Sequence, residues 1–182
     1  MTYQRIAGYP TGTAPSFWEE AIWWSKNPAP EKTRTEPADQ TPVSWEEMAV
    51  WWDEAQGEEG DLWHRTLIDP TLLRVLGQVD GLKVLDLACG NGYLSRRLAR
   101  SGAKVIGVDA AASIVELARS REEREPLGIT YHVADAARLD MLEDGTFDVV
   151  LSNMALMDLP DAEVALKESA PAGRMSCAPW SG

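Results

Sequence analysis

Apolar and polar positions repeat in a regular way from residue 81 onward. Short apolar runs at residues 83–87, 105–108, 129–133 and 147–151 predict four buried strands. Between these runs the apolar residues recur at helical spacing, which predicts a helix after each of the first two strands. Strands that alternate with helices are typical of βαβ units. We therefore expect an α/β, Rossmann-like, doubly wound parallel sheet with a ligand at the carboxyl ends of its strands.

The first 60 residues follow a different pattern, and we interpret them as an aromatic, helical extension. A first helix candidate surrounds Phe17 and Trp24, and residues 27–42 form a proline-rich linker without apolar periodicity. Ser44 with Glu47 three residues later is a capping-box pattern that predicts a helix start. A further start is expected at residues 69–70, with Asp as the N-cap and Pro at the first helical position.

The last residues break the alternation of strands and helices. After a helix that begins near residue 161, the segment 169–182 reads SAPAGRMSCAPWSG, with small residues and two prolines. It contains no apolar run able to form a buried strand. We therefore divide the chain into the extension 1–60, a core at 61–168 and an irregular tail at 169–182.

Composition narrows the class of function. The chain has 182 residues and a net charge of −12, which repels phosphate backbones and makes a nucleic-acid partner unexpected. No apolar run reaches the roughly 18 residues of a membrane span, and no signal-peptide pattern is visible. The two cysteines, Cys89 and Cys177, suggest neither disulfides nor a metal site, so we expect a cytoplasmic protein. A small-molecule substrate fits best.

The most informative segment is VLDLACGNG at residues 84–92. It predicts a buried strand, then a tight turn at Gly90 and Gly92, then a helix, an arrangement that brings backbone N–H groups close to a ligand. Asp86 adds a fixed acceptor at the end of the strand. Asp109 closes the second strand, where its carboxylate could accept hydrogen bonds from both hydroxyls of a ribose; the alternative is a helix N-cap, which we consider the weaker explanation.

Together these segments resemble the class I S-adenosylmethionine-dependent methyltransferases. The likeness covers roughly residues 63–166 and depends on four motifs in the right order: DxAxGxG at 86–92, Asp109, ADA at 134–136, and FDVV at 147–150 followed by SNMAL at 152–156. The chain departs from the family at Ala88, where glycine is frequent.

The resemblance implies S-adenosyl-L-methionine as the cofactor and assigns roles to single residues. Asp86 is expected to fix its amino-acid end, Asp135 to accept from the adenine amine, and Arg65 to pair with its carboxylate. The full set of expected cofactor-binding residues is Arg65, Asp86, Ala88, Gly90, Gly92, Asp109, Ala110, Asp135, Ala136 and Asn153.

No residue is predicted to be catalytic. Methyl transfer needs mainly alignment in a dry pocket, and the two histidines, His64 and His132, are isolated in the sequence. Seven of the eight tryptophans precede residue 64. They could form an aromatic wall over a substrate ring or cation, or simply pack the helices onto the sheet.

The family has a seven-stranded sheet, and this sequence predicts four strands, with strands five to seven missing, as in a C-terminally truncated or frameshifted member. The fourth strand would then be an open edge, from which we expect low stability or self-association. The expected function is methyl transfer to a small molecule. The alternative is an incomplete fragment that at most binds the cofactor. A nicotinamide-dependent dehydrogenase is weaker, since Ser95 replaces the third glycine of GxGxxG.

Overall fold

The computed structural model describes residue 26, residues 44–143 and 145–170, and the backbone of 174–177. The helix expected near residues 17–24 and the linker at 27–42 lie outside these residues. No helix within the described part of the chain is long and apolar enough to cross a membrane.

Five parallel strands form one sheet in the order β3-β2-β1-β4-β5. Their bounds are β1 Lys83–Leu87, β2 Lys104–Asp109, β3 Thr130–Val133, β4 Val149–Ser152 and β5 Arg174–Cys177. The chain runs outward from β1 through β2 to β3, and then crosses to the other side of β1 to form β4. Such a reversal leaves a crevice at the carboxyl ends of β1 and β4, where α/β sheets bind their ligands. The predicted doubly wound fold is confirmed.

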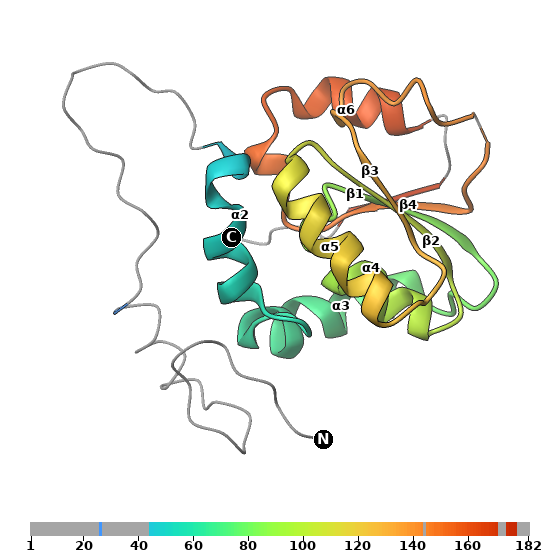
Figure 1. Cartoon of the computed structure of the whole chain (residues 1–182). Helices are drawn as coiled ribbons and strands as arrows, with labels where there is room; N and C mark the ends of the chain where they lie inside the picture. The colour runs from blue at the N-terminus through green and yellow to red at the C-terminus, as the bar shows by residue number, and fades with distance from the viewer. Residues whose placement is uncertain (1–25, 27–43, 144, 171–173, 178–182) are drawn as a thin grey trace.

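Helices cover both faces of the sheet (Figure 1). They are α2 Trp45–Gln56, α3 Asp69–Leu76, α4 Tyr93–Arg100, α5 Ala112–Arg124 and α6 Ala162–Ser169, with short helical turns at His64–Ile68 and Leu156–Asp158. In Figure 1, α6 lies on one side of the strands, and α3, α4 and α5 lie on the other.

Alternate residues of the central strands pack into two separate hydrophobic cores, one on each face of the sheet. Val84 and Val149 pack with the residues of α3, α4 and α5, whereas Leu85 and Val150 pack with Phe147 and the α6 side. This alternation is the period-two geometry of a strand buried on both faces. It explains why the strands read as continuous apolar runs in the sequence.

β5 corrects one prediction. The sequence predicted no strand after residue 168, but Arg174–Cys177 pairs with β4 in parallel, Val149 opposite Arg174 and Ser152 opposite Cys177. β4 is therefore an inner strand and the expected open edge lies one strand further out. The segment was missed because it is short and lacks an apolar run, and pairing depends on backbone groups that every residue supplies.

A second correction concerns Asp69, which does not cap a helix. The chain enters α3 directly from a π-helical turn at His64–Ile68, and the Asp69 N–H donates to the carbonyl of His64. The wider turn accommodates Pro70, whose ring would clash with a carbonyl of a regular helix. The Asp69 carboxylate is fully buried and accepts hydrogen bonds from Tyr93 Oη at 3.1 Å and Arg97 Nη1 at 2.6 Å.

The predicted helix at Ser44 is confirmed as α2, and polar contacts hold it at the carboxyl ends of the strands. Asn91 Nδ2, in the glycine turn, donates to Asp53 Oδ1 at 2.9 Å and to the Gly57 carbonyl at 3.1 Å. Arg121 of α5 pairs with the same Asp53 carboxylate at 2.6 Å. The extension therefore forms part of whatever site lies at this end of the sheet.

Candidate functional site

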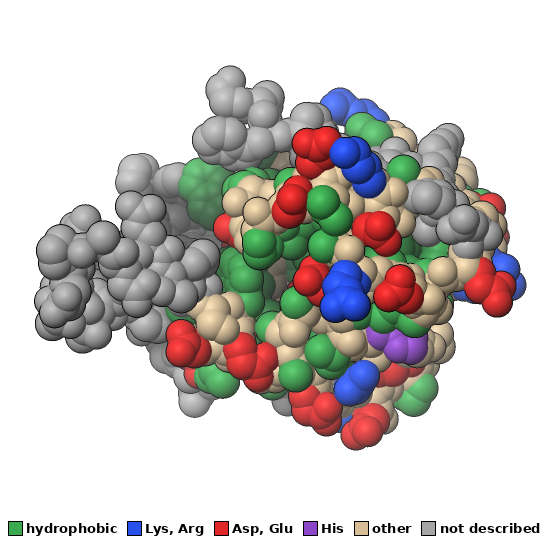
Figure 2. Space-filling view, turned by 90° about the horizontal axis from the view of Figure 1, so that it is seen from above, with side chains coloured by type: hydrophobic (Ala, Val, Ile, Leu, Met, Phe, Trp, Pro, Cys, Tyr) green, Lys and Arg blue, Asp and Glu red, His purple; other side chains and the backbone are tan. Residues whose placement is uncertain are grey.

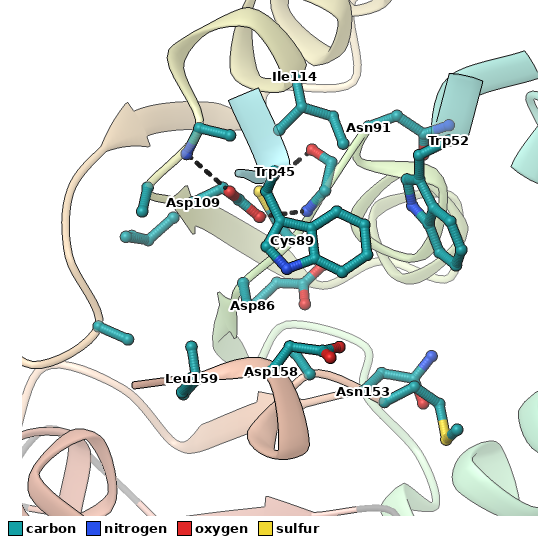
Figure 3. A pocket seen from close by; sticks show the side chains of 18 of the residues that line it. Trp45, Trp52, Asp86, Cys89, Asn91, Asp109, Ile114, Asn153, Asp158 and Leu159 are labelled. Carbon is teal, nitrogen blue, oxygen red and sulfur yellow. Dashed lines mark hydrogen bonds between the residues drawn. The ribbon is translucent and has the colours of Figure 1, made fainter. Parts of the chain in front are cut away.

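A cavity of about 830 Å³ opens at the carboxyl ends of the strands. It is bounded by α2, the glycine turn, the segments that follow β2 and β3, and the segment from Asn153 to Pro160. Figure 3 shows Trp45, Trp52 and Asp109 on one side of the cavity, Asp158 and Leu159 on the other, and Asp86 between the two sides. The volume suits a ligand of cofactor size.

The glycine turn shapes the floor of this cavity. Ala88 and Gly90 both have left-handed backbone conformations, with φ of 57° and 54°, and both line the cavity. Gly92, which precedes α4 with φ of 74°, does not line it. A side chain at Gly92 would collide with the hydroxyl of Tyr131, so this glycine permits close packing of α4 against β3.

Asp86 lies at the end of β1 and is 2% exposed. Its Oδ2 accepts a hydrogen bond from Ser95 Oγ at 2.5 Å. Burial raises the pKa of Asp86 to about 7, and the hydrogen bond from Ser95 opposes that rise. Near neutral pH this carboxyl group is therefore poised between its acid and its carboxylate, and a cation in the cavity would favour the carboxylate.

Asp109 occupies the corresponding position at the end of β2. Its Oδ2 accepts from the Gly90 N–H at 2.9 Å and its Oδ1 from the Ala111 N–H at 3.0 Å. Burial raises the pKa of Asp109, and these backbone donors oppose the rise. The carboxylate thus ties β2 to the glycine turn and also faces the cavity, as a ribose acceptor would require.

Two further predicted groups complete the wall. Asp135 Oδ1 accepts from the Ala137 N–H at 2.9 Å, which holds the exposed carboxylate in the turn after β3, beside the buried Ala136. Asn153 follows β4, and its Nδ2 donates to Tyr93 Oη at 3.0 Å. The cavity is lined by eight of the ten predicted residues, namely Asp86, Ala88, Gly90, Asp109, Ala110, Asp135, Ala136 and Asn153.

Arg65 and Gly92 are the two predicted residues outside the lining. His64, the residue before Arg65, lines the cavity instead and is 6% exposed. Asp61 Oδ1 accepts from the His64 backbone N–H at 2.8 Å and contacts His64 Nδ1 at 2.9 Å. The π-helical turn determines which of the two side chains faces the cavity, and the sequence carried no signal of that turn.

Gln56 is a second lining residue that sequence reasoning missed. It is the last residue of α2 and is 2% exposed. Within the described part of the chain, neither polar atom of its side chain has a hydrogen-bond partner. A glutamine near a predicted helix end usually faces solvent, so no pattern could have identified it.

The aromatic residues of α2 form one side of the cavity. Trp45 and Trp52 are in edge-to-face contact with centroids 5.5 Å apart, and Trp52 Nε1 lies 3.7 Å from where a Cβ at Gly90 would be. Met48 and Ile114 add apolar surface. These two tryptophans therefore pack together and also line the cavity.

The lining of the cavity is predominantly acidic. Five acidic side chains line it and, among the described residues, no lysine or arginine does; the acids are Glu46, Asp86, Asp109, Asp135 and Asp158. Such a lining favours a cationic ligand over an anionic one. No cluster of three potential metal ligands occurs in the described part of the chain.

Comparison with known proteins gives a consistent result. Residues 84–172 match the model of a methyltransferase domain family. The chain is 33% identical over 132 residues to the ubiquinone biosynthesis O-methyltransferase of Coxiella burnetii, covering 69% of this chain and 54% of that protein. The corresponding enzyme of Xanthomonas euvesicatoria is 30% identical over the same length. The chain thus spans about half the length of the curated relatives it matches.

Solved structures agree. An S-adenosylmethionine-dependent methyltransferase from Mesorhizobium loti superimposes with a TM-score of 0.52 at 32% identity, covering 58% of this chain and 47% of that one. A methyltransferase of the same type from Aquifex aeolicus gives a TM-score of 0.60 at 19% identity, covering 72% and 71% of the two chains, and shows the shared fold.

Proposed function

Because this chain belongs to the class I S-adenosylmethionine-dependent methyltransferases, we propose that it transfers a methyl group from that cofactor to an oxygen atom of a small, uncharged acceptor. One observation carries the proposal. Residues from three neighbouring strand ends, Asp86, Asp109 and Asp135, line one cavity together with the glycine turn. An extended nucleoside ligand lying across β3, β2 and β1 would meet these carboxylates one after another.

The chemistry asks the protein for orientation and exclusion of water. When bound, S-adenosylmethionine would supply a methyl group on a positively charged sulfur, which is already activated for transfer. The sulfur–methyl bond would break as the oxygen–methyl bond forms, S-adenosylhomocysteine would leave, and the hydroxyl proton would pass to water. The acidic lining would favour binding of that positively charged group, and Asp86 is the buried carboxyl group on the central strand. The apolar wall of Trp45, Trp52 and Leu159 keeps water away from the reacting atoms.

The nature of the acceptor follows from the same lining. Acidic side chains oppose an anionic acceptor, whereas tryptophan rings stack well on a flat ring. The matched relatives are named as O-methyltransferases of ubiquinone biosynthesis, which supports a hydroxyl group on a ring as the methyl acceptor. A nucleic-acid acceptor is opposed by the net charge of −12 and by the acidic side chains spread over the face shown in Figure 2.

Calorimetric titration tests the cofactor. We expect S-adenosylhomocysteine to bind and NAD not to bind. Ser95 stands where a dinucleotide-binding turn has its third glycine, and its hydroxyl donates a hydrogen bond to Asp86. Absence of S-adenosylhomocysteine binding at millimolar concentration would overturn the proposal. Transfer of labelled methyl groups to simple catechols then separates an active enzyme from a fragment that only binds the cofactor.

Asp109 provides a residue-level test. Replacing it by alanine removes the carboxylate expected to accept the ribose hydroxyls, so the affinity for S-adenosylhomocysteine should fall about 10- to 100-fold, the value of a charged hydrogen bond. The exposed Asp140→Ala is the matched control and should bind like the wild type. Equal affinities of the two variants would remove Asp109 from the cofactor site.

Two further proposals concern the cellular location of the protein and its self-association. Cys89 is a buried free thiol, which supports a reducing, cytoplasmic location. Within the described residues β5 pairs with a strand on one side only, so its outer backbone groups are available to a second copy of the chain. We propose self-association through this edge.

A further inference from the structure

Three side-chain amide atoms at the cavity have no hydrogen-bond partner among the described residues. Gln56 Nε2, Gln56 Oε1 and Asn153 Oδ1 are all buried and make no hydrogen bond with any residue that the structure describes. Buried polar atoms are almost always paired, and here both residues line the same cavity. Unpaired groups in this position indicate a ligand that supplies the missing hydrogen bonds.

A chain of contacts connects these amides at one end of the cavity. Gln56 follows Trp52 by one helical turn, and the Trp52 ring lies 6.5 Å from that of His64. The His64 ring lies 5.4 Å from the ring of Tyr93, whose hydroxyl is bonded to Asn153. The next residue after Gln56, Gly57, accepts a hydrogen bond from Asn91 of the glycine turn. The polar end of the cavity thus lies over the turn and beside β4.

The order of the strands indicates which part of a ligand reaches this end. Asp135 follows β3, Asp109 ends β2, Asp86 belongs to β1 and Asn153 follows β4, and the sheet has the order β3-β2-β1-β4. If the adenine binds at Asp135 and the ribose at Asp109, as the resemblance implies, the sulfur would lie over β1. The amino-acid end of the cofactor must then extend toward Asn153 and Gln56.

The chemistry of that end matches an amide. The amino-acid end carries an ammonium group and a carboxylate, and no lysine or arginine lines the described cavity to pair with the latter. A glutamine can accept from the ammonium through Oε1 and donate to the carboxylate through Nε2. Asn153 Oδ1 offers a second acceptor.

We propose that Gln56 binds the α-amino and α-carboxylate groups of S-adenosylmethionine, with Asn153 as the second contact. This inference rests on the proposed function, since it names the residue that recognises one part of the cofactor. It assigns to Gln56 the role that the sequence suggested for Arg65, which does not line the cavity.

Two ligands separate the amino-acid end from the rest of the cofactor. S-adenosylhomocysteine has that end, whereas 5′-methylthioadenosine keeps the nucleoside and the sulfur but lacks it. For Gln56→Met we expect the affinity for S-adenosylhomocysteine to fall at least 10-fold, while that for 5′-methylthioadenosine stays within 2-fold of the wild type. Gln78→Met is the matched control at an exposed glutamine and should change neither affinity.

The ligand-free melting temperature gives an independent readout. Methionine fills the volume of Gln56 without an unpaired polar group, so the Q56M variant should melt at or above the wild-type temperature. If the role of Gln56 were only structural, this substitution would lower the melting temperature. If Q56M fails to fold, Gln56→Glu keeps the shape of the side chain and adds a negative charge. We expect this variant to bind S-adenosylhomocysteine more weakly and 5′-methylthioadenosine as the wild type does.

Each other result overturns a defined claim. If the wild type binds neither ligand, the proposed function fails. If the wild type binds both but Q56M loses both equally, or loses neither, Gln56 does not bind the amino-acid end. If only the KM for a methyl acceptor changes, Gln56 contacts the acceptor, which contradicts the assignment.

Discussion

Asp86 links the stability of the protein to pH. Its pKa is about 7 in the folded state and 3.8 as an ordinary side chain, so between these values the folded chain holds a proton that the unfolded chain has lost. The contribution of Asp86 to stability is therefore fully present below about pH 4 and is lost as pH rises toward 7. Above pH 7 the folded protein keeps a buried charge.

Replacing Asp86 by asparagine should remove this dependence. At pH 8 we expect the free energy of unfolding of D86N to exceed that of the wild type by about 2–4 kcal/mol, since each pKa unit corresponds to about 1.4 kcal/mol. At pH 4 the two proteins should be equally stable. Urea unfolding at both pH values measures the difference, and Asp140→Asn on the surface is the control. If D86N and the wild type differed in free energy of unfolding by the same amount at both pH values, the raised pKa of Asp86 would be contradicted.

Ala88 is a point of backbone strain. It has φ of 57°, a left-handed conformation that disfavours any residue with a Cβ. Ala88→Gly should therefore raise the free energy of unfolding by about 1 kcal/mol. In contrast, Ala99→Gly within the regular helix α4 should lower it by about 0.5–1 kcal/mol. Chemical denaturation of both variants tests the prediction, and a destabilised A88G would show that the turn needs the methyl group.

At the scale of elements, α2 is joined to the core by a partly buried polar link. The Asp53 carboxylate accepts from Asn91 and Arg121, and the Arg121 side chain is 11% exposed. Glu46 Oε1 and Oε2 also accept from the Ser113 N–H at 3.2 Å, at the other end of α2. The helix that carries Trp52 and Gln56 therefore has its position defined at both ends.

Asp53→Ala should release the C-terminal end of α2. Because the substitution removes the carboxylate that pairs with Arg121 and one of the two acceptors of Asn91, we expect a loss of about 2–4 kcal/mol of stability. Hydrogen exchange should become faster in α2 but stay slow in β1. The control is Glu163→Ala, which breaks an exposed ion pair with Lys167 and should cost less than about 1 kcal/mol. Unchanged exchange in α2 would show that its tryptophans alone hold it in place.

For the whole molecule, the outer edge of β5 determines the expected association state. An unpaired strand edge is a template for pairing with another chain. We expect the apparent mass in light scattering to rise with protein concentration and to be insensitive to salt, because backbone pairing carries no net charge. A monomer mass at every concentration up to about 100 µM would contradict the proposal.

The sequence alone determined four of the five strands and eight of the residues that line the cavity. Four apolar runs defined β1 to β4 because strands buried on both faces must be apolar throughout. The glycine turn, Asp109 and Asp135 could be identified because each occupies a strand end, and parallel strands bring their carboxyl ends to one edge of the sheet. Local pattern and topology were sufficient for these residues.

The tertiary structure decided the rest. β5 depends on backbone pairing with β4, and Asp69 is buried because Tyr93 and Arg97 fold over it. Gln56 and His64 face the cavity because contacts with Asn91 and Asp61 set the path of the chain between α2 and α3. Such contacts join segments whose spacing in the sequence has no period. Periodicity reveals which face of an element is buried, but the neighbours of a polar side chain depend on how separate elements meet in space.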